Sequence, residues 1–252
     1  MDNFITRGDF CYNYLTKEEL IVAFCYLLLG HLLGDFVLQT NRIAVNKPLY
    51  RSWGIVHAVI VTLCMLIFSI PFGFITMLLV IPAGILHFII DKKKTEFSDK
   101  YKLPELPAFI ADQVLHVGIL YLASRYAAAD ASLLLLDRFH AEFIVTAILV
   151  TFFAAILNQY ILAIFCPRPG NVLFWKGEKL FGNIIRFILF IAFFLSITYS
   201  YFFLLLLILI PVVHLIKEHF YGKYPMSKFE ALIKVVLDVM VSALGSVILS
   251  LL

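Results

Sequence analysis

The chain has 252 residues, of which 62% are hydrophobic and only 15% are charged, and its mean hydropathy is +0.96. Soluble domains carry about 25% charged residues, so this composition excludes an ordinary soluble protein. The net charge of +3 gives no indication of nucleic-acid binding. None of the four cysteines forms a Cys-x-x-Cys pair, so no disulfide framework is expected.

The apolar residues are gathered in long runs. A run of about 18 or more apolar residues is long enough to cross the hydrocarbon core of a bilayer. A crossing segment must satisfy its own backbone polar groups, so helix is the expected conformation. We therefore predict an all-α, polytopic integral membrane protein with about eight transmembrane helices. The expected spans are 20–40, 53–70, 73–91, 107–125, 141–166, 182–198, 201–217 and 229–251.

Local signals mark several ends of these spans. Thr16 with Glu19, and Ser227 with Glu230, have the spacing of capping boxes that open the first and last spans. The segment 71–73, which contains proline and glycine, predicts the turn between the second and third spans.

The lysines and arginines of the expected loops are divided unequally, with fourteen on one side and four on the other. Short basic loops stay in the cytoplasm. The division predicts that both termini lie outside and that the loops after the odd-numbered spans lie inside. We expect a short extracytoplasmic segment at 1–19, a four-helix membrane domain at 20–126 and a second four-helix membrane region at 127–252. No cleavable signal peptide is expected at 1–20.

Ionisable side chains gather in the first four spans, although an Asp at the centre of a membrane helix costs about 2.5 kcal/mol or more. Most of them are spaced four residues apart, which places them on one helix face about a turn apart. His31 and Asp35 lie in the first span, His57 in the second, His87 and Asp91 in the third, and Asp112 and His116 in the fourth, with Gln39, Lys47 and Gln113 beside them.

These groups all fall within roughly 15 Å of the expected cytoplasmic edge, because an α-helix rises about 1.5 Å per residue. Imidazoles and carboxylates together suit Zn²⁺, Mn²⁺ or Fe²⁺, so we predict one divalent-metal site. Seven candidate ligands exceed one tetrahedral shell. Either two ions bind, or some groups orient the ligands, or one of the carboxylates Asp35 and Asp112 is catalytic. A proton relay or a polar network without metal is the alternative. The seven candidate ligands are His31, Asp35, His57, His87, Asp91, Asp112 and His116.

Residues outside this set are expected to be structural. Gly34 and Gly84 are small residues that let neighbouring helices approach closely. In the C-terminal half, Arg186 and the pairs His214/Glu218 and Lys234/Asp238 are interpreted as ion-pairing groups.

Over about residues 20–120 this pattern resembles a bacterial membrane family known as domain of unknown function 3307. The resemblance rests on His31-Leu-Leu-Gly-Asp35 with Gln39 and Lys47, on His57, on His87 with Asp91, and on Asp112-Gln113 with His116. It implies a multi-pass protein of the bacterial inner membrane and supplies no established activity. The C-terminal half resembles the family only faintly.

Three functions are compatible with these features. The first is a metal-dependent hydrolase of a lipid-linked or phosphorylated substrate, in which the metal activates water. The second is a transporter of a divalent cation or of a proton-coupled solute, whose site is expected nearer the midplane. The third is a non-catalytic membrane subunit. The sequence does not determine the oligomeric state.

Overall fold

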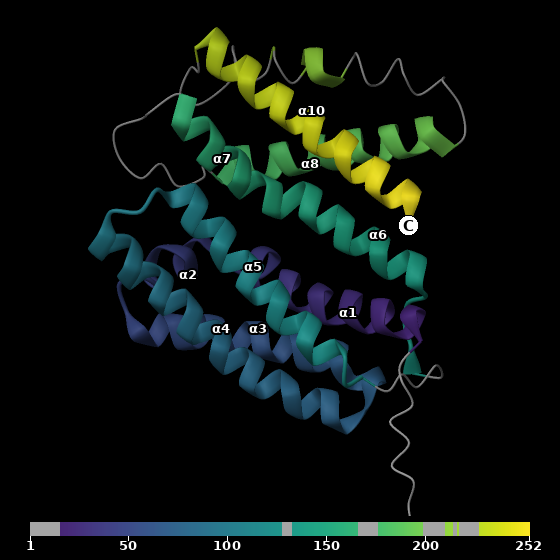
Figure 1. Cartoon of the computed structure of the whole chain (residues 1–252). Helices are drawn as coiled ribbons and strands as arrows, with labels where there is room; N and C mark the ends of the chain where they lie inside the picture. Colours follow the sequence, from purple (N-terminus) through teal and green to yellow (C-terminus); the bar gives the residue numbers. More distant parts are fainter. Residues whose placement is uncertain (1–15, 128–132, 166–175, 199–209, 214–215, 217–226) are drawn as a thin grey trace, which may run out of the picture.

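The computed structural model describes residues 16–127, 133–165, 176–198, 210–213, 216 and 227–252. Within this part of the chain the regular elements are helical (Figure 1), which confirms the all-α prediction. The helices that form the framework are α1 (Lys17–Leu32), α2 (Asn41–Asn46), α3 (Arg51–Ser69), α4 (Gly73–Tyr101), α5 (Glu105–Ser124), α6 (Arg138–Ile148), α7 (Ala154–Phe165), α8 (Lys176–Thr198) and α10 (Lys228–Leu251). Two π-helices, η1 (Leu33–Val37) and η4 (Leu149–Phe153), and a 3-10 helix, η2 (Ile70–Phe72), lie between them.

Six helical stretches in the described part are long and apolar enough to cross a membrane. One of them, Arg51–Tyr101, contains α3, η2 and α4, and so includes two of the predicted spans. The other stretches are Lys17–Val37, Glu105–Ser124, Arg138–Phe165, Leu180–Thr198 and Phe229–Leu251.

Some predictions fall where the structure gives no description. The expected span 201–217 lies largely outside the described residues, as do segment 1–15 and the pair His214/Glu218. The number of eight spans, the orientation and the boundary near residue 126 therefore stay predictions.

Helix α1 occupies the middle of the first half. It contacts α3, α5 and α6, and most of its residues from Ala23 to Leu32 are buried. The hydroxyl of Tyr26 donates to the carbonyl of Leu136 and accepts from the Leu136 N–H, both at 2.7 Å, which ties α1 to the segment before α6. The outer helices α3, α4 and α5 expose large apolar side chains, as surfaces that face lipid do.

Helices α3 and α4 form an antiparallel hairpin, as the turn predicted at 71–73 requires. Gly73 begins α4 with φ of 81°, a left-handed backbone that favours glycine. Farther along the hairpin, a Cβ atom on Gly84 would collide with the side chain of Thr62. Similarly, a Cβ atom on Gly34 would lie 2.6 Å from Cα of Val61. The prediction that both glycines mark close helix contacts is confirmed.

Both predicted capping boxes are present. The Thr16 N–H donates to Glu19 Oε2 at 2.9 Å, and the Glu19 N–H donates to Thr16 Oγ1 at 3.2 Å. Ser227 and Glu230 make the same reciprocal bonds at 2.8 and 3.2 Å. These bonds satisfy N–H groups that lack partners at a helix start.

Helix α4 is longer than predicted. The expected span ends at Asp91, but the helix continues to Tyr101 and stops at Lys102, which has φ of 51°. The basic residues after Asp91 predict a loop, and this part of the prediction is wrong. Charge limits how far a helix extends into lipid, not how far it extends into water. Lys92 and Lys93 both pair with Glu96, at 3.6 and 2.7 Å, on the exposed face of this extension.

The second half contains its own buried polar cluster. Arg186 on α8 donates through Nη1 to Asp238 Oδ1 on α10 at 2.7 Å, and through Nε to the Thr151 carbonyl in η4 at 3.2 Å. Asn158 on α7 also donates to Asp238 Oδ1, at 2.8 Å. The sequence predicts Asp238 as the partner of Lys234, and the structure adds this ion pair between two helices.

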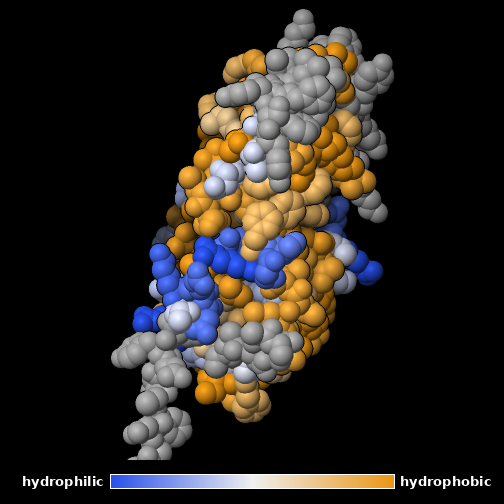
Figure 2. Space-filling view, turned by 90° about the vertical axis from the view of Figure 1, so that its right-hand side faces the viewer, coloured by the Kyte–Doolittle hydropathy of each residue, from blue (hydrophilic) through white to orange (hydrophobic). Residues whose placement is uncertain are grey.

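Figure 2 shows the end of the molecule where α1 begins and α10 ends. Hydrophilic residues form a band across this end, with hydrophobic surface on either side. At the start of α6, Arg138 and Glu142 pair at 2.8 Å, and Asp137 pairs with His140 at 2.7 Å. The polar cluster predicted from the sequence lies toward the other end of α1.

Candidate metal centre

Asp35 lies in a π-helix that interrupts the end of the first membrane helix. The Leu38 N–H donates to the Leu33 carbonyl, five residues back, at 2.8 Å. Such wide turns are frequent at functional sites. Asp35 is buried, and its Oδ1 lies 3.0 Å from Nε2 of His57 on α3. Gln113 on α5 donates to the other oxygen, Oδ2, at 3.4 Å.

His57 also faces His87, across the hairpin of α3 and α4. Their Nε2 atoms are 3.3 Å apart, and both side chains are buried. Oδ2 of Asp91 lies 3.6 Å from His57 Nε2 and 3.9 Å from His87 Nε2. Ligand atoms about 2.0–2.1 Å from a tetrahedral ion are about 3.3 Å from one another. The atoms of Asp35, His57 and His87 therefore already have nearly the spacing of metal ligands.

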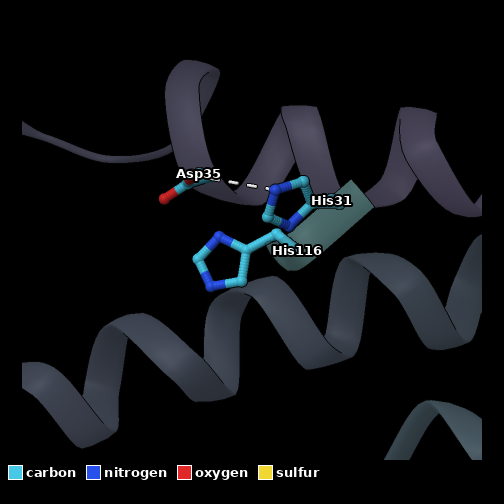
Figure 3. A group of neighbouring side chains, drawn as sticks. All are labelled: His31, Asp35 and His116. Carbon is cyan, nitrogen blue, oxygen red and sulfur yellow. Dashed lines mark ion pairs between the residues drawn. The ribbon is translucent and has the colours of Figure 1, made fainter. Parts of the chain in front are cut away.

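His31 and His116 form the other side of the cluster. Their ring centroids are 5.2 Å apart, and His31 Nε2 lies 3.8 Å from Asp35 Oδ2. Figure 3 shows the two rings next to each other, with the Asp35 carboxylate beside them and a dashed line marking its ion pair with His31. The ring of His116 also lies 4.2 Å from that of His87, centroid to centroid. All four imidazoles thus share one buried region between α1, α3, α4 and α5.

Several imidazole nitrogens in this region have no hydrogen-bond partner among the described residues. Both nitrogens of His116 are in this state, as are Nε2 of His31 and Nδ1 of His57 and of His87. Burying a polar atom without a partner costs free energy. Coordination to a cation through a lone pair would satisfy Nε2 of His31 and one nitrogen of His116, whereas His57 and His87 face their neighbours through Nε2.

The candidate ligands form three overlapping groups, in each of which the ligand atoms lie within 4.8 Å of one another. The overlap means that Asp35, His87 and His116 each belong to two groups. The donor set of imidazole and carboxylate fits Zn²⁺, Mn²⁺ or Fe²⁺. The groups are His31 with Asp35 and His116, Asp35 with His57 and His87, and His87 with Asp91 and His116.

Asp112 has a different environment from the other six residues. It is buried in the first half of α5, but it belongs to none of these groups. Its Oδ2 accepts from Lys94 Nζ and from Gln113 Nε2, both at 3.0 Å. Its Oδ1 has no hydrogen-bond partner among the described residues. One oxygen is therefore held while the other remains able to accept a proton or a ligand.

Two lysines balance the carboxylates. Lys47, after α2, donates to Asp91 Oδ2 at 2.8 Å, and Lys94 pairs with Asp112. Burial lowers the pKa of Lys47, but the negative charges of Asp91 and Asp35 outweigh burial and raise that pKa above its usual range. Lys47 is therefore positively charged. Within the described part of the chain, Asp35 is the carboxylate of the cluster without a lysine ion pair.

A cavity of about 580 Å³ reaches the carboxylates from the end of the helices where α2 lies. Its size is within the range of small-molecule sites, about 300–1,000 Å³. Asp35, Asp91 and Asp112 line it, whereas the four histidines lie beyond them. Predicted site residues Gln39, Lys47 and Gln113 line it too, together with the basic side chains of Arg51, Lys92 and Lys94.

Sequence reasoning missed the role of Lys94. In the sequence it belongs to the basic stretch Lys92 to Lys94, which is interpreted as a topology anchor or, alternatively, as an attraction for anionic headgroups or a phosphorylated substrate. The structure instead pairs it with Asp112 and places its ammonium 6.0 Å from the ring centre of Phe109. The signal that would have identified it is its position three residues after Asp91, which keeps it on nearly the same helix face.

An all-helical fold with apolar, membrane-length helices around buried His and Asp defines the chain as a polytopic membrane protein with a polar centre. Residues 23–145 match the family model described as protein of unknown function (DUF3307), so the resemblance seen in the sequence is confirmed. The match extends into α6 and leaves the C-terminal half uncovered. A search of curated proteins and a search of solved structures found no match.

Proposed function

We propose that this chain is a membrane-embedded, metal-dependent hydrolase that acts on a lipid-linked or phosphorylated substrate at the cytoplasmic face of a bacterial inner membrane. One observation supports the metal above all. Oδ1 of Asp35 lies 3.0 Å from Nε2 of His57, which in turn lies 3.3 Å from Nε2 of His87. All three side chains are buried. That spacing is close to the separation of ligands on one tetrahedral ion.

The four histidines and Asp35 are the residues that would hold the ion or ions, and Asp91 is at the edge of the same set. A bound divalent ion supplies an activated water and polarises the group to be cleaved. The chain provides the rest. Lys47 and Lys94 neutralise Asp91 and Asp112, so the cluster keeps one carboxylate, Asp35, for the cation.

Asp112 is suited to act as general base. It lines the cavity, its Oδ1 is unpartnered among the described residues, and Lys94 and Gln113 fix the carboxylate through Oδ2. A general base must lie within hydrogen-bond reach of the proton that it takes. In the proposed reaction, water that enters from the cavity would give its proton to the Asp112 carboxylate.

The position of the cavity supports hydrolysis over transport. The cavity approaches the carboxylates beside α2 and the extension of α4, where the charged side chains of Lys92, Lys94 and Glu96 also line it. A substrate can reach this end from the membrane surface. Transporter sites lie near the bilayer midplane, typically between broken helices. Uptake of the divalent ion into proteoliposomes would favour the transporter instead.

The test is the metal content of the protein purified in detergent, measured by inductively coupled plasma mass spectrometry. We expect bound Zn, Mn or Fe in the wild type and its loss in His87→Ala. The control is His140→Ala, because His140 is an exposed histidine on the surface pair with Asp137. A wild type and control that both lack metal would contradict the proposal. Chelator-sensitive release of phosphate from phospholipid vesicles would then test the reaction.

A further inference from the structure

A second, largely apolar groove adjoins the cavity of the candidate metal centre. Its volume is about 960 Å³, and it lies between α6 with η4 on one side and α8 on the other. Gln39 and Asn41 line both spaces, so the two meet at the segment between η1 and α2. The apolar lining includes Phe143, Ile144, Ala147, Phe152, Ile184 and Phe187.

The polar residues of the groove are concentrated near this junction. Gln39, Thr40, Asn41 and Arg42 follow one another in the chain, while the walls farther along α6 and α8 are mostly apolar. The guanidinium of Arg42 lies 5.0 Å from the ring centre of Trp53, within the range of a cation–π contact. The groove therefore has an apolar body and one polar end, and that end faces the cavity.

Gln39 carries a further sign of a ligand at the junction. Its Oε1 is buried and has no hydrogen-bond partner among the described residues. An amide oxygen accepts hydrogen bonds only, so its natural partner is a hydroxyl or N–H group. A glycerol or sugar hydroxyl between a chain and a headgroup would supply such a donor.

We infer that the substrate is a membrane lipid whose hydrocarbon chain lies in the groove between α6 and α8 while its phosphate-bearing headgroup extends past Gln39 and Asn41 into the cavity. This inference rests on the proposed function and selects a lipid over a soluble phosphorylated compound. In the cavity, Arg51 provides positive charge for a phosphate, and the ammonium groups of Lys47 and Lys94, although paired with carboxylates, line the same space. Gln39, at the junction, and Asp35 both line the cavity, so a headgroup that enters past Gln39 shares this space with the Asp35 carboxylate.

Variants that fill the groove test this arrangement. Ile184→Trp on α8 and Ala147→Phe on α6 place extra atoms in the groove from opposite walls. Ile188→Trp is the matched control, because Ile188 is exposed to 42% against 46% for Ile184, on the same helix, but does not line the groove. Binding is measured with a pyrene-labelled, long-chain phosphatidic acid in nanodiscs of phosphatidylcholine, and in parallel with glycerol 3-phosphate.

We expect both groove variants to weaken binding of the long-chain probe by about tenfold, the effect of losing roughly two buried methylene groups. Ile188→Trp should bind it like the wild type, and all three should keep the metal content of the wild type. Unchanged probe binding in both groove variants would overturn the inference, as would equal affinity of the wild type for glycerol 3-phosphate and the lipid. Absence of metal from the wild type would instead refute the proposed function, whatever the probe does.

Discussion

Asp35 on η1 faces His57 on α3 through Oδ1 at 3.0 Å, while its Oδ2 lies 3.8 Å from Nε2 of His31 on α1. One buried carboxylate thus has an imidazole on each side. If the cluster binds a divalent ion, Asp35 contributes to whichever group of histidines holds it, since it belongs to two of the three groups.

Asp35→Asn should therefore weaken divalent-ion binding more than either His31→Ala or His57→Ala. The amide keeps the size of the side chain and removes its negative charge. Loss of a group that only orients a ligand costs about 10–100-fold in metal affinity, so we expect a loss of about 100-fold or more for Asp35→Asn. Competition with a fluorescent zinc chelator measures the affinity. A wild-type affinity in Asp35→Asn, with a loss in His57→Ala, would refute a central role for this carboxylate.

Lys47→Met should raise metal affinity while it lowers substrate binding. Lys47 is charged and 2.8 Å from Asp91, so removing it frees a carboxylate and removes a repelling charge from the cluster. We expect an increase of about tenfold or more in zinc affinity, measured by the same competition. Lys47→Arg keeps the charge and serves as control. If Lys47→Met loses metal, then the lysine supports the site instead of competing with the cation.

Gly34→Ala should destabilise the protein, because the new Cβ would lie 2.6 Å from Cα of Val61 and the two helices would have to separate. Overpacking of this kind costs about 1–3 kcal/mol. Gly118→Ala is the control, since a Cβ atom there meets nothing within 4 Å. Alanine in a helix interior is favoured over glycine by about 0.5–1 kcal/mol, so this control should not lower the melting temperature in detergent. Equal melting temperatures for the two variants would contradict the close contact.

Arg186→Met should destabilise the second half without changing metal content. It leaves Asp238 buried without its arginine partner, and breaking a buried ion pair typically costs about 3–5 kcal/mol. The double variant Arg186→Met with Asp238→Leu removes both charges and should recover much of the loss. Thermal unfolding and metal content are measured on both. Loss of metal in a folded Arg186→Met protein would show that the two polar clusters are coupled.

The sequence predicted the polar cluster of the first half because two simple signals agree. The i, i+4 spacing places His31 with Asp35, His87 with Asp91 and Asp112 with His116 on single helix faces. Loop charges gave alternating directions for the helices, which brought these faces to one level. Both signals are local, so they can be read without knowing how the helices pack.

What the sequence did not predict depends on packing between distant segments. The π-helix η1 contacts α3 and the π-helix η4 contacts α8, and no residue pattern in the sequence indicated either of them. The pairing of Lys94 with Asp112 could not be predicted, because it depends on α4 continuing past Asp91 as a helix. The loop charges alone predicted that the helix ends there. Likewise, the groove beside Gln39 is formed by α6 and α8 together with the end of η1, so no single run of residues indicates it.

X-ray absorption spectroscopy of the metal-loaded protein tests the central claim most directly, because it reports the atoms bound to the ion. We predict nitrogen and oxygen ligands at about 2.0–2.2 Å with the multiple scattering of at least two imidazoles, and loss of the imidazole contribution in the double variant His57→Ala with His87→Ala. A spectrum of a hydrated ion without imidazole, or one with sulfur ligands at about 2.3 Å, would contradict a metal centre built from Asp35 and these histidines.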